Sequence, residues 1–241
     1  MANNQFQDFT HVSNYPQYMK IVEQFIKDNG KPGQSHLDMP AGNGLLADNL
    51  KKAGFNSVCG DFNSERPDYI YVNMEKELPF KDSSFDFVTC MEGIEHVINP
   101  SHLVEELSRI VKLGGYVVIT MPNVQNFYSR LKFLFTGFFY QFEPEFTRHP
   151  NGKPLDRGHI SSLTYAQLNY LFVENNLQPV YIDGDKFKRK LLMPIYLIFA
   201  AINSLFYRSK IKAEKIEMPY ALMNNKKFFF SRSLVAVWKK S

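Results

Sequence analysis

Short apolar runs alternate with amphipathic segments along most of the chain, and this alternation restricts the fold more than any other feature. Residues 15–29 place four apolar side chains on one helical face: Met19, Val22, Phe25 and Ile26. Runs typical of strands lie at 35–39, 57–61, 69–73, 85–90, 116–121, 179–183 and 233–239. Strands that alternate with helices predict an α/β fold, with a mostly parallel, Rossmann-like sheet of seven strands and helices on both faces.

Two helices carry boundary signals in the sequence. Asn99 is a good N-cap residue, and Pro100 fits the first position of the helix that follows. Thr164 and Gln167 have the spacing of a capping box that begins a helix over 165–175. Each helix precedes a predicted strand, as the alternating pattern requires.

A glycine turn follows the first predicted strand. Glycines there let a ligand approach the backbone closely, and Asp61, at the end of the second strand, can accept hydrogen bonds from ribose hydroxyls. Gly42, Gly44 and Ala47 also satisfy the dinucleotide fingerprint. Asp38, beside the turn, would repel a pyrophosphate but attract an amino-acid ammonium group. The turn therefore favours S-adenosylmethionine over a nicotinamide dinucleotide.

Five ordered segments make the chain similar to a known family. They are the turn 36–44, the pair Gly60-Asp61, the stretch 78–86, the segment 92–97 and the stretch 113–116. Over about residues 30–185 and the final strand, the chain resembles the class I S-adenosylmethionine-dependent methyltransferases. Residues 88–97 are especially similar to the ubiquinone-biosynthesis O-methyltransferases. The overall layout is also similar to methyltransferases associated with bacterial cell-surface polysaccharides.

The resemblance implies a set of cofactor contacts. The methionine part would lie against Asp38, Ala41, Gly42 and Gly44, the ribose against Asp61, the adenine between Asn73 and Met74, and the sulfonium near Glu92. One position departs from the family pattern, because Pro40 stands where the first glycine is expected. The two glycines that matter most for close approach remain, so we expect S-adenosylmethionine to bind.

Histidines are the first candidates for a catalytic base, because a hydroxyl acceptor must lose its proton near neutral pH. His96 follows the fourth predicted strand, and His149 and His159 flank a loop-rich stretch. We select His96 and His159.

A metal is the other interpretation of the segment around His96. Glu92, Glu95 and His96 are spaced as i, i+3 and i+4, and the resemblance to quinone-pathway enzymes associates this trio with a magnesium-type ion. Three donors on a short turn indicate a metal only weakly. We therefore expect no metal, with Glu95 and His96 orienting the loop.

Residues 186–215 carry eight Lys or Arg and a single acid, Glu214. Within them, residues 191–207 are uncharged and, as a helix, would extend about 25 Å, which is too short to cross a bilayer. The segment either lies on an anionic membrane surface or packs within the protein, and we favour the membrane. Nucleic acid is disfavoured, because the basic residues flank an apolar helix.

The expected organisation has four parts. Residues 1–30 form an N-terminal helix and cap, and 31–185 form the cofactor-binding core, in which 123–160 is a lid or substrate wall. Residues 186–230 are a basic-apolar helical insertion, and 231–241 supply the final strand. The first residues lack the basic and apolar regions of a signal peptide, so we expect a cytoplasmic protein. From the basic-apolar segment we expect it to be peripheral on the inner membrane face.

The expected activity is S-adenosylmethionine-dependent O-methylation of a hydroxyl on a glycan, a lipid-linked molecule or another small-molecule acceptor. A quinone-type phenol is the nearest alternative acceptor. A nucleotide-dependent oxidoreductase and a non-catalytic scaffold with the same fold are the alternatives from other classes.

Overall fold

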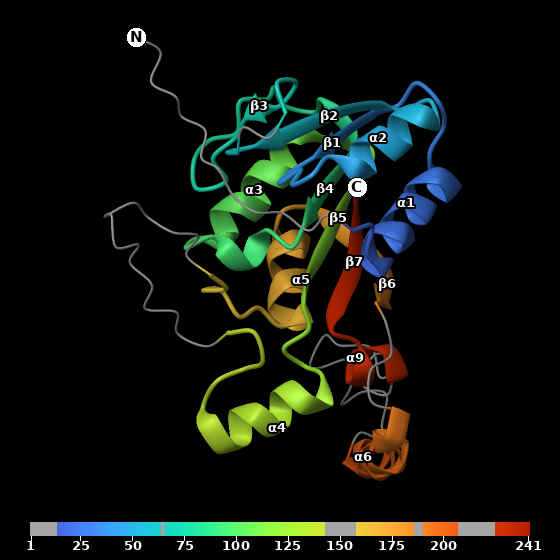
Figure 1. The fold of residues 1–241 in the computed structure, drawn as a ribbon, viewed down its shortest axis with the longest axis vertical. Coiled ribbons are helices and arrows are strands. Elements are labelled where there is room, and N and C mark those ends of the chain that lie inside the picture. The colour runs from blue at the N-terminus through green and yellow to red at the C-terminus, as the bar shows by residue number, and fades with distance from the viewer. Residues whose placement is uncertain (1–13, 64–65, 143–157, 186–189, 207–224) are drawn as a thin grey trace.

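The computed structural model describes residues 14–63, 66–142, 158–185, 190–206 and 225–241, and its centre is one seven-stranded sheet (Figure 1). The strand order is β3-β2-β1-β4-β5-β7-β6. Strand β7 runs antiparallel to both of its neighbours, and every other pair is parallel. The strands are β1 (Ser35–Asp38), β2 (Asn56–Asp61), β3 (Ile70–Tyr71), β4 (Phe85–Met91), β5 (Val111–Pro122), β6 (Leu177–Gly184) and β7 (Ser233–Lys240).

Helices cover both faces of this sheet. The helical elements are α1 (Gln17–Asn29), α2 (Leu45–Lys52), η1 (Ile94–His96), α3 (Pro100–Ile110), α4 (Phe127–Thr136), α5 (Tyr165–Glu174), η2 (Lys190–Leu192), α6 (Met193–Phe206) and α9 (Lys226–Phe230). One apolar cluster joins α3 and α5 to the sheet, and a second joins α1 and α2 to it. The predicted α/β architecture with a mostly parallel, seven-stranded sheet is confirmed.

The predicted helix signals act as expected. The Asn99 side chain accepts a hydrogen bond from the backbone N–H of His102 at the start of α3. Thr164 and Gln167 form the full capping box of α5. These local hydrogen bonds satisfy backbone groups that a helix end leaves unpaired, which is why the sequence marks both starts clearly.

Strands β3, β5 and β6 differ in length from the prediction, and β6 runs 177–184 where 179–183 was expected. Strand β3 is shorter than the expected 69–73, because it pairs at the sheet edge only with Gly60 and Asp61. Strand β5 begins at Val111, earlier than the expected residue 116, and its pairing with β4 shifts register between Phe85 and Phe87. This irregularity falls at Gly114 and Gly115, and the φ of 77° at Gly114 is one that glycine adopts easily.

A histidine lies inside the sheet. His36 on β1 is fully buried, and its two ring nitrogens hydrogen-bond to the hydroxyl oxygens of Ser57 and Thr89, each at 3.1 Å. Ser57 is on β2 and Thr89 on β4, so the imidazole connects the first strand to both neighbours. Burial lowers the pKa of His36 to about 3.

We predict that His36 makes the fold acid-sensitive. The unfolded state takes up a proton near pH 6.5 and the folded state only near pH 3, so stability is complete above pH 6.5 and is lost as the pH falls. Between pH 7 and 5 this group alone should remove about 2 kcal/mol from the free energy of unfolding. Urea unfolding of wild type and His36→Gln at both pH values measures this contribution. Equal losses in the two proteins would contradict the prediction.

Candidate functional site

The candidate site lies at the topological switch point of the sheet, beside β1. Strand β1 pairs on one side with β2 and on the other with β4, so successive crossovers lead away from β1 in opposite directions. Open α/β sheets bind ligands at the carboxyl ends of the strands beside such a point. Asp38 ends β1 and Glu92 directly follows β4, which brings both carboxyl groups to this edge.

Asp38 has an unusual environment for a carboxyl group. Its side chain is 0% exposed, and its Oδ1 accepts a hydrogen bond of 2.8 Å from the Thr89 hydroxyl. Its Oδ2 is buried and makes no hydrogen bond to the residues that the structure describes. Burial raises the pKa of Asp38 to about 8, although the Thr89 bond acts in the opposite direction. A buried carboxylate oxygen in this state fits a cationic ligand group, such as the ammonium of an amino acid.

The glycine turn after Asp38 has the backbone shape that only glycine adopts easily. Gly42 and Gly44 have φ angles of 54° and 71°, and Gly44 is the residue from which α2 begins. A Cβ atom on Gly44 would lie 2.6 Å from Arg66 Nη1 and 2.9 Å from the Tyr69 hydroxyl oxygen. That hydroxyl donates a 2.8 Å hydrogen bond to the Gly42 carbonyl. Glycine is therefore favoured at position 44 by its φ, and a larger residue would also displace the ends of the Arg66 and Tyr69 side chains.

Asp61 lies against the same turn. Its Oδ2 accepts a 2.8 Å hydrogen bond from the Gly42 N–H, and its Oδ1 accepts one of 3.1 Å from the Asn63 N–H. A carboxylate oxygen can accept more than one hydrogen bond, so this arrangement leaves capacity for ribose hydroxyls. Asp61 thus ties the end of β2 to the turn after β1, and its contact with a ribose remains a prediction.

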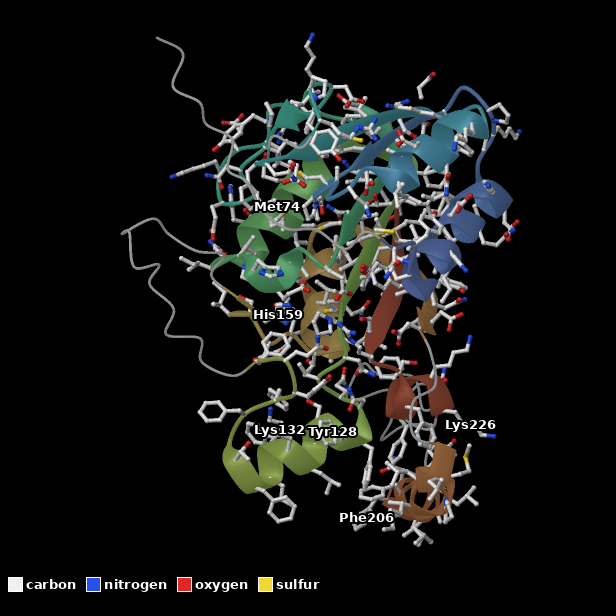
Figure 2. The ribbon with its side chains drawn as sticks, in the orientation of Figure 1. Met74, Tyr128, Lys132, His159, Phe206 and Lys226 are labelled. Carbon is white, nitrogen blue, oxygen red and sulfur yellow. The ribbon has the colours of Figure 1, made fainter. Side chains whose placement is uncertain are left out.

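The other predicted cofactor residues lie on the same strands or just after them. Ala41 is buried in the turn, and its N–H donates to the Gly60 carbonyl at 3.1 Å. Asn73 and Met74 follow β3; the Asn73 Oδ1 accepts from the Glu75 N–H at 2.9 Å, and Met74 packs against the main core. In Figure 2, Met74 lies at the flank of the sheet where His159 also lies. Their contact with adenine remains a prediction.

Glu92 turns sharply away from β4. Its φ of 48° lies in the left-handed region, which a residue other than glycine seldom adopts. Its N–H donates to the Thr120 carbonyl at 2.9 Å, and the Thr120 hydroxyl donates to its Oε1 at 3.2 Å. Burial raises the pKa of Glu92, against the opposing effects of Thr120 and the Arg232 charge. Backbone strain of this kind is concentrated at functional sites.

Sequence reasoning missed two residues of this neighbourhood. Burial raises the pKa of Tyr18 on α1, and the negative charges of Glu92 and Glu95 add to the effect, whereas the Arg232 charge opposes it. Tyr18 and Arg232 are therefore within electrostatic reach of the acids that follow β4. Neither residue belongs to a motif, so only the fold reveals them.

The two predicted catalytic histidines lie together. The rings of His96 and His159 meet edge to face, with 4.8 Å between their centroids. His159 Nε2 is 4.0 Å from Oε1 of the buried Glu95. The backbone explains the meeting, because the N–H groups of Ile160 and Ser161 donate to the Glu95 carbonyl at 2.9 and 3.0 Å. His149, the third candidate, lies outside the described residues.

The donor groups that cluster here differ from the metal trio considered from the sequence. Among the described residues, Glu95, His96 and His159 have ligand atoms within 4.8 Å of one another. Glu92 is not in this group, because the Thr120 hydroxyl holds its carboxylate. Two imidazoles and one carboxylate can hold a divalent ion, but they can equally bind and release a proton.

We predict that Asp38 makes the unliganded protein less stable as the pH rises. Below about pH 4 both states are protonated, and the folded carboxyl stays protonated up to about pH 8, so the contribution of Asp38 falls across this interval by up to about 1.4 kcal/mol per pH unit, against the rise that His36 gives below pH 6.5. Asp38→Asn removes this fall. Asp38→Asn also removes most of the rise in melting temperature that S-adenosylhomocysteine gives, because the variant has no carboxylate to bind the ammonium group of the ligand.

Thermal unfolding at pH 5, 6.5 and 8, with and without S-adenosylhomocysteine, measures both effects. Asp28→Asn, which changes an exposed acid on α1, is the control and should behave as wild type. The same ligand-induced rise in wild type and Asp38→Asn would contradict the assignment of Asp38.

Comparison with protein families matches residues 9–182 to a family described as a methyltransferase domain. The ubiquinone biosynthesis O-methyltransferase of Dechloromonas aromatica is 34% identical over 106 residues, which cover 38% of this chain and 45% of that protein. The demethylmenaquinone methyltransferase of Paenarthrobacter aurescens is 36% identical over 98 residues, which cover 37% and 39%. The chain thus spans less than half the length of either curated relative.

Solved structures share the fold over nearly the whole chain. A SAM-dependent methyltransferase from Archaeoglobus fulgidus is 18% identical, with a TM-score of 0.56 over 92% of this chain and 94% of that one. One from Methanosarcina mazei is also 18% identical, with a TM-score of 0.55 over 90% and 96%. The family match covers most of the chain, and the sheet order and glycine turn agree with it. The chain belongs to the methyltransferase-domain family, in its class I, S-adenosylmethionine-dependent branch.

Proposed function

We propose that this chain transfers a methyl group from S-adenosylmethionine to a hydroxyl oxygen of a small-molecule acceptor. The observation that carries the proposal is the contact of His96 and His159 beside the buried Glu95, directly after β4. A hydroxyl becomes a good nucleophile only when a nearby base takes its proton, and imidazole does so near neutral pH. The carboxylate of Glu95 stabilises the imidazolium that results.

The bound cofactor supplies an electrophilic methyl group on a sulfonium. An acceptor oxygen would displace the sulfur at that methyl carbon and leave S-adenosylhomocysteine, and the hydroxyl proton would pass to an imidazole nitrogen of His96 or His159. Asp38 holds the ammonium end, and the turn at Gly42 and Gly44 allows close approach of the backbone. Positioning supplies much of the rate, because the leaving group is already a good one.

A pocket near this edge supports an amphipathic acceptor. Its cavity volume is small, about 80 Å³, which is room for part of an acceptor, and Arg232 connects it electrostatically to Glu92. Its lining is mostly aromatic: Asn126, Phe127, Tyr128, Tyr140, Leu192, Phe229, Phe230 and Arg232. Aromatic walls with one guanidinium suit an acceptor that combines an apolar part with a polar or anionic group. A lipid-linked glycan or another lipid-linked molecule has this chemistry.

A quinone-type phenol is the second candidate acceptor. The observation that favours it is the similarity to a protein named ubiquinone biosynthesis O-methyltransferase, over 38% of this chain. A phenol ring with an apolar tail would also suit the aromatic pocket. The two candidates differ in the hydroxyl that reacts, so labelled-methyl transfer to each class distinguishes them.

The proposed location is the cytoplasmic face of a membrane, with residues 186–215 as the contact. No helix within the described ranges is long and apolar enough to cross a membrane. Of the segment, the structure describes only 190–206, where α6 is uncharged along its length. Peripheral contact would bring a lipid-linked acceptor within reach.

We predict that His96→Ala and His159→Ala each lower the rate of methyl transfer by about 10²- to 10⁴-fold. Each variant lacks either the base that takes the acceptor proton or the histidine that orients this base. The measurement is transfer of a labelled methyl group from S-adenosylmethionine to a catechol and, in parallel, to a total lipid extract. The affinity for S-adenosylhomocysteine should change little, because neither histidine is assigned to cofactor binding.

His102→Ala, on α3, is the matched control, since this histidine lies outside the cluster. Wild-type transfer rates in His96→Ala and His159→Ala would contradict the proposed base. Label that appears only in the catechol would select the quinone-type acceptor.

A further inference from the structure

Helix α4 exposes a run of large apolar side chains. Leu134 and Phe135 are 72% and 80% exposed. Four further side chains on or just after the helix are exposed as well: Tyr128, Leu131, Phe133 and Phe138. Water-exposed apolar side chains occur singly on most proteins, but a contiguous group of this size indicates a surface that contacts something apolar.

Helix α6 presents a second group of the same kind. Leu205 and Phe206 are 65% and 71% exposed, and Tyr196 is the one buried residue among the described residues of this helix. The other exposed apolar side chains are Leu197, Ile198, Phe199 and Ile202, with Leu191 just before the helix. They cover one broad face of the helix, whereas a helix that packs on a core exposes its polar face.

The two helices are held at one end of the molecule by an aromatic cluster. Phe127 on α4 meets Phe199 on α6 with ring centroids 5.7 Å apart, and it stacks on Phe229 of α9 at 5.0 Å. Tyr196 contacts the same Phe229 ring at 5.2 Å. Figure 2 shows Tyr128, Lys132, Phe206 and Lys226 at this one end. We name the exposed apolar side chains of α4 and α6 together the two-helix surface.

The charge in the sequence around this surface is mostly positive, although Asp183 pairs with Lys227 and Asp185 accepts from the Arg232 N–H. Residues 123–142, 186–213 and 225–232 contain no Asp or Glu at all, whereas each of the three contains Lys or Arg. Arg130 and Lys132 lie on α4, and Lys226 and Lys227 begin α9. Exposed apolar side chains flanked by an excess of basic residues match an anionic bilayer, where the apolar groups enter the interface and the cations meet headgroups.

We propose that the two-helix surface docks the protein onto an anionic lipid bilayer, with α4 contributing as much as α6. The docking proposal deepens the proposed function. It rests on that function only for the idea that the acceptor comes from the membrane. A second copy of the chain is the competing occupant, but two identical surfaces would bring like charges together. Charge complementarity therefore selects the bilayer.

The position of the surface fits this role. Helix α4 follows β5, α6 follows β6, and α9 precedes the antiparallel β7, so all three lie beyond the edge of the sheet where Asp38 and Glu92 lie (Figure 1). The aromatic pocket has walls from α4, α9 and η2. A molecule with its tail in the bilayer could therefore reach the pocket without leaving the membrane.

The test is cosedimentation with vesicles, which needs no activity or acceptor. Wild type should bind vesicles of phosphatidylcholine with about one quarter phosphatidylglycerol, bind pure phosphatidylcholine far less, and be released as salt rises. The double variants Leu134→Glu/Phe135→Glu on α4 and Leu205→Glu/Phe206→Glu on α6 should each bind at least about tenfold more weakly.

Leu113→Glu/Tyr170→Glu changes two equally exposed apolar residues elsewhere, and should bind as wild type. Thermal unfolding confirms that each variant is folded, and S-adenosylhomocysteine binding that its cofactor site is intact. Unchanged vesicle binding by the α4 variant, or equal binding to neutral and anionic vesicles, would overturn the proposal. Dimerisation in solution that both double variants abolish, without vesicle binding by wild type, would assign the surface to a second copy.

Discussion

The parallel pairing of β1 with both β2 and β4 determines where the candidate cofactor residues at the ends of β1, β2 and β4 lie. It buries Asp38 at the strand end between two neighbours, and it directs the glycine turn, Asp61 and Glu92 to one edge of the sheet. The same pairing encloses His36, which remains neutral and bonded to both adjacent strands. A carboxyl group that stays protonated to about pH 8 is costly to bury as an ion, and a cationic ligand group offsets that cost.

The candidate base depends on a second, more local constraint. Residues 158–161 are far in sequence from η1, yet two backbone hydrogen bonds to the Glu95 carbonyl hold them beside it. Those bonds set the 4.8 Å separation of the two imidazole rings and bring His159 towards a buried carboxylate. Glu92 is held separately by Thr120, in a strained left-handed turn. The two acids after β4 therefore have different surroundings, because Glu95 lies near His159 and the Thr120 hydroxyl holds Glu92.

Much of the fold follows from local signals that the sequence displays. Caps such as Asn99 and Thr164 satisfy backbone groups within a few residues, and buried parallel strands read as apolar runs, so both were predictable. The glycine turn and Asp38 were predictable because their spacing is local too. Three other features were not predictable, since each depends on packing between distant segments. They are the contact of His96 with His159, the proximity of Tyr18 and Arg232 to Glu92, and the exposed face of α4.

The central claim, a site for S-adenosylmethionine at the β1–β4 edge, is tested most directly by calorimetric titration. Purified protein would be titrated with S-adenosylmethionine, S-adenosylhomocysteine and NADH, and the series repeated with Asp61→Ala and Asp61→Asn. We expect micromolar binding of the first two ligands, weakened by both substitutions, and no binding of NADH. Binding of NADH alone would contradict the account and identify a nucleotide-dependent oxidoreductase, whereas no binding of any ligand by a folded protein would leave a scaffold without a cofactor.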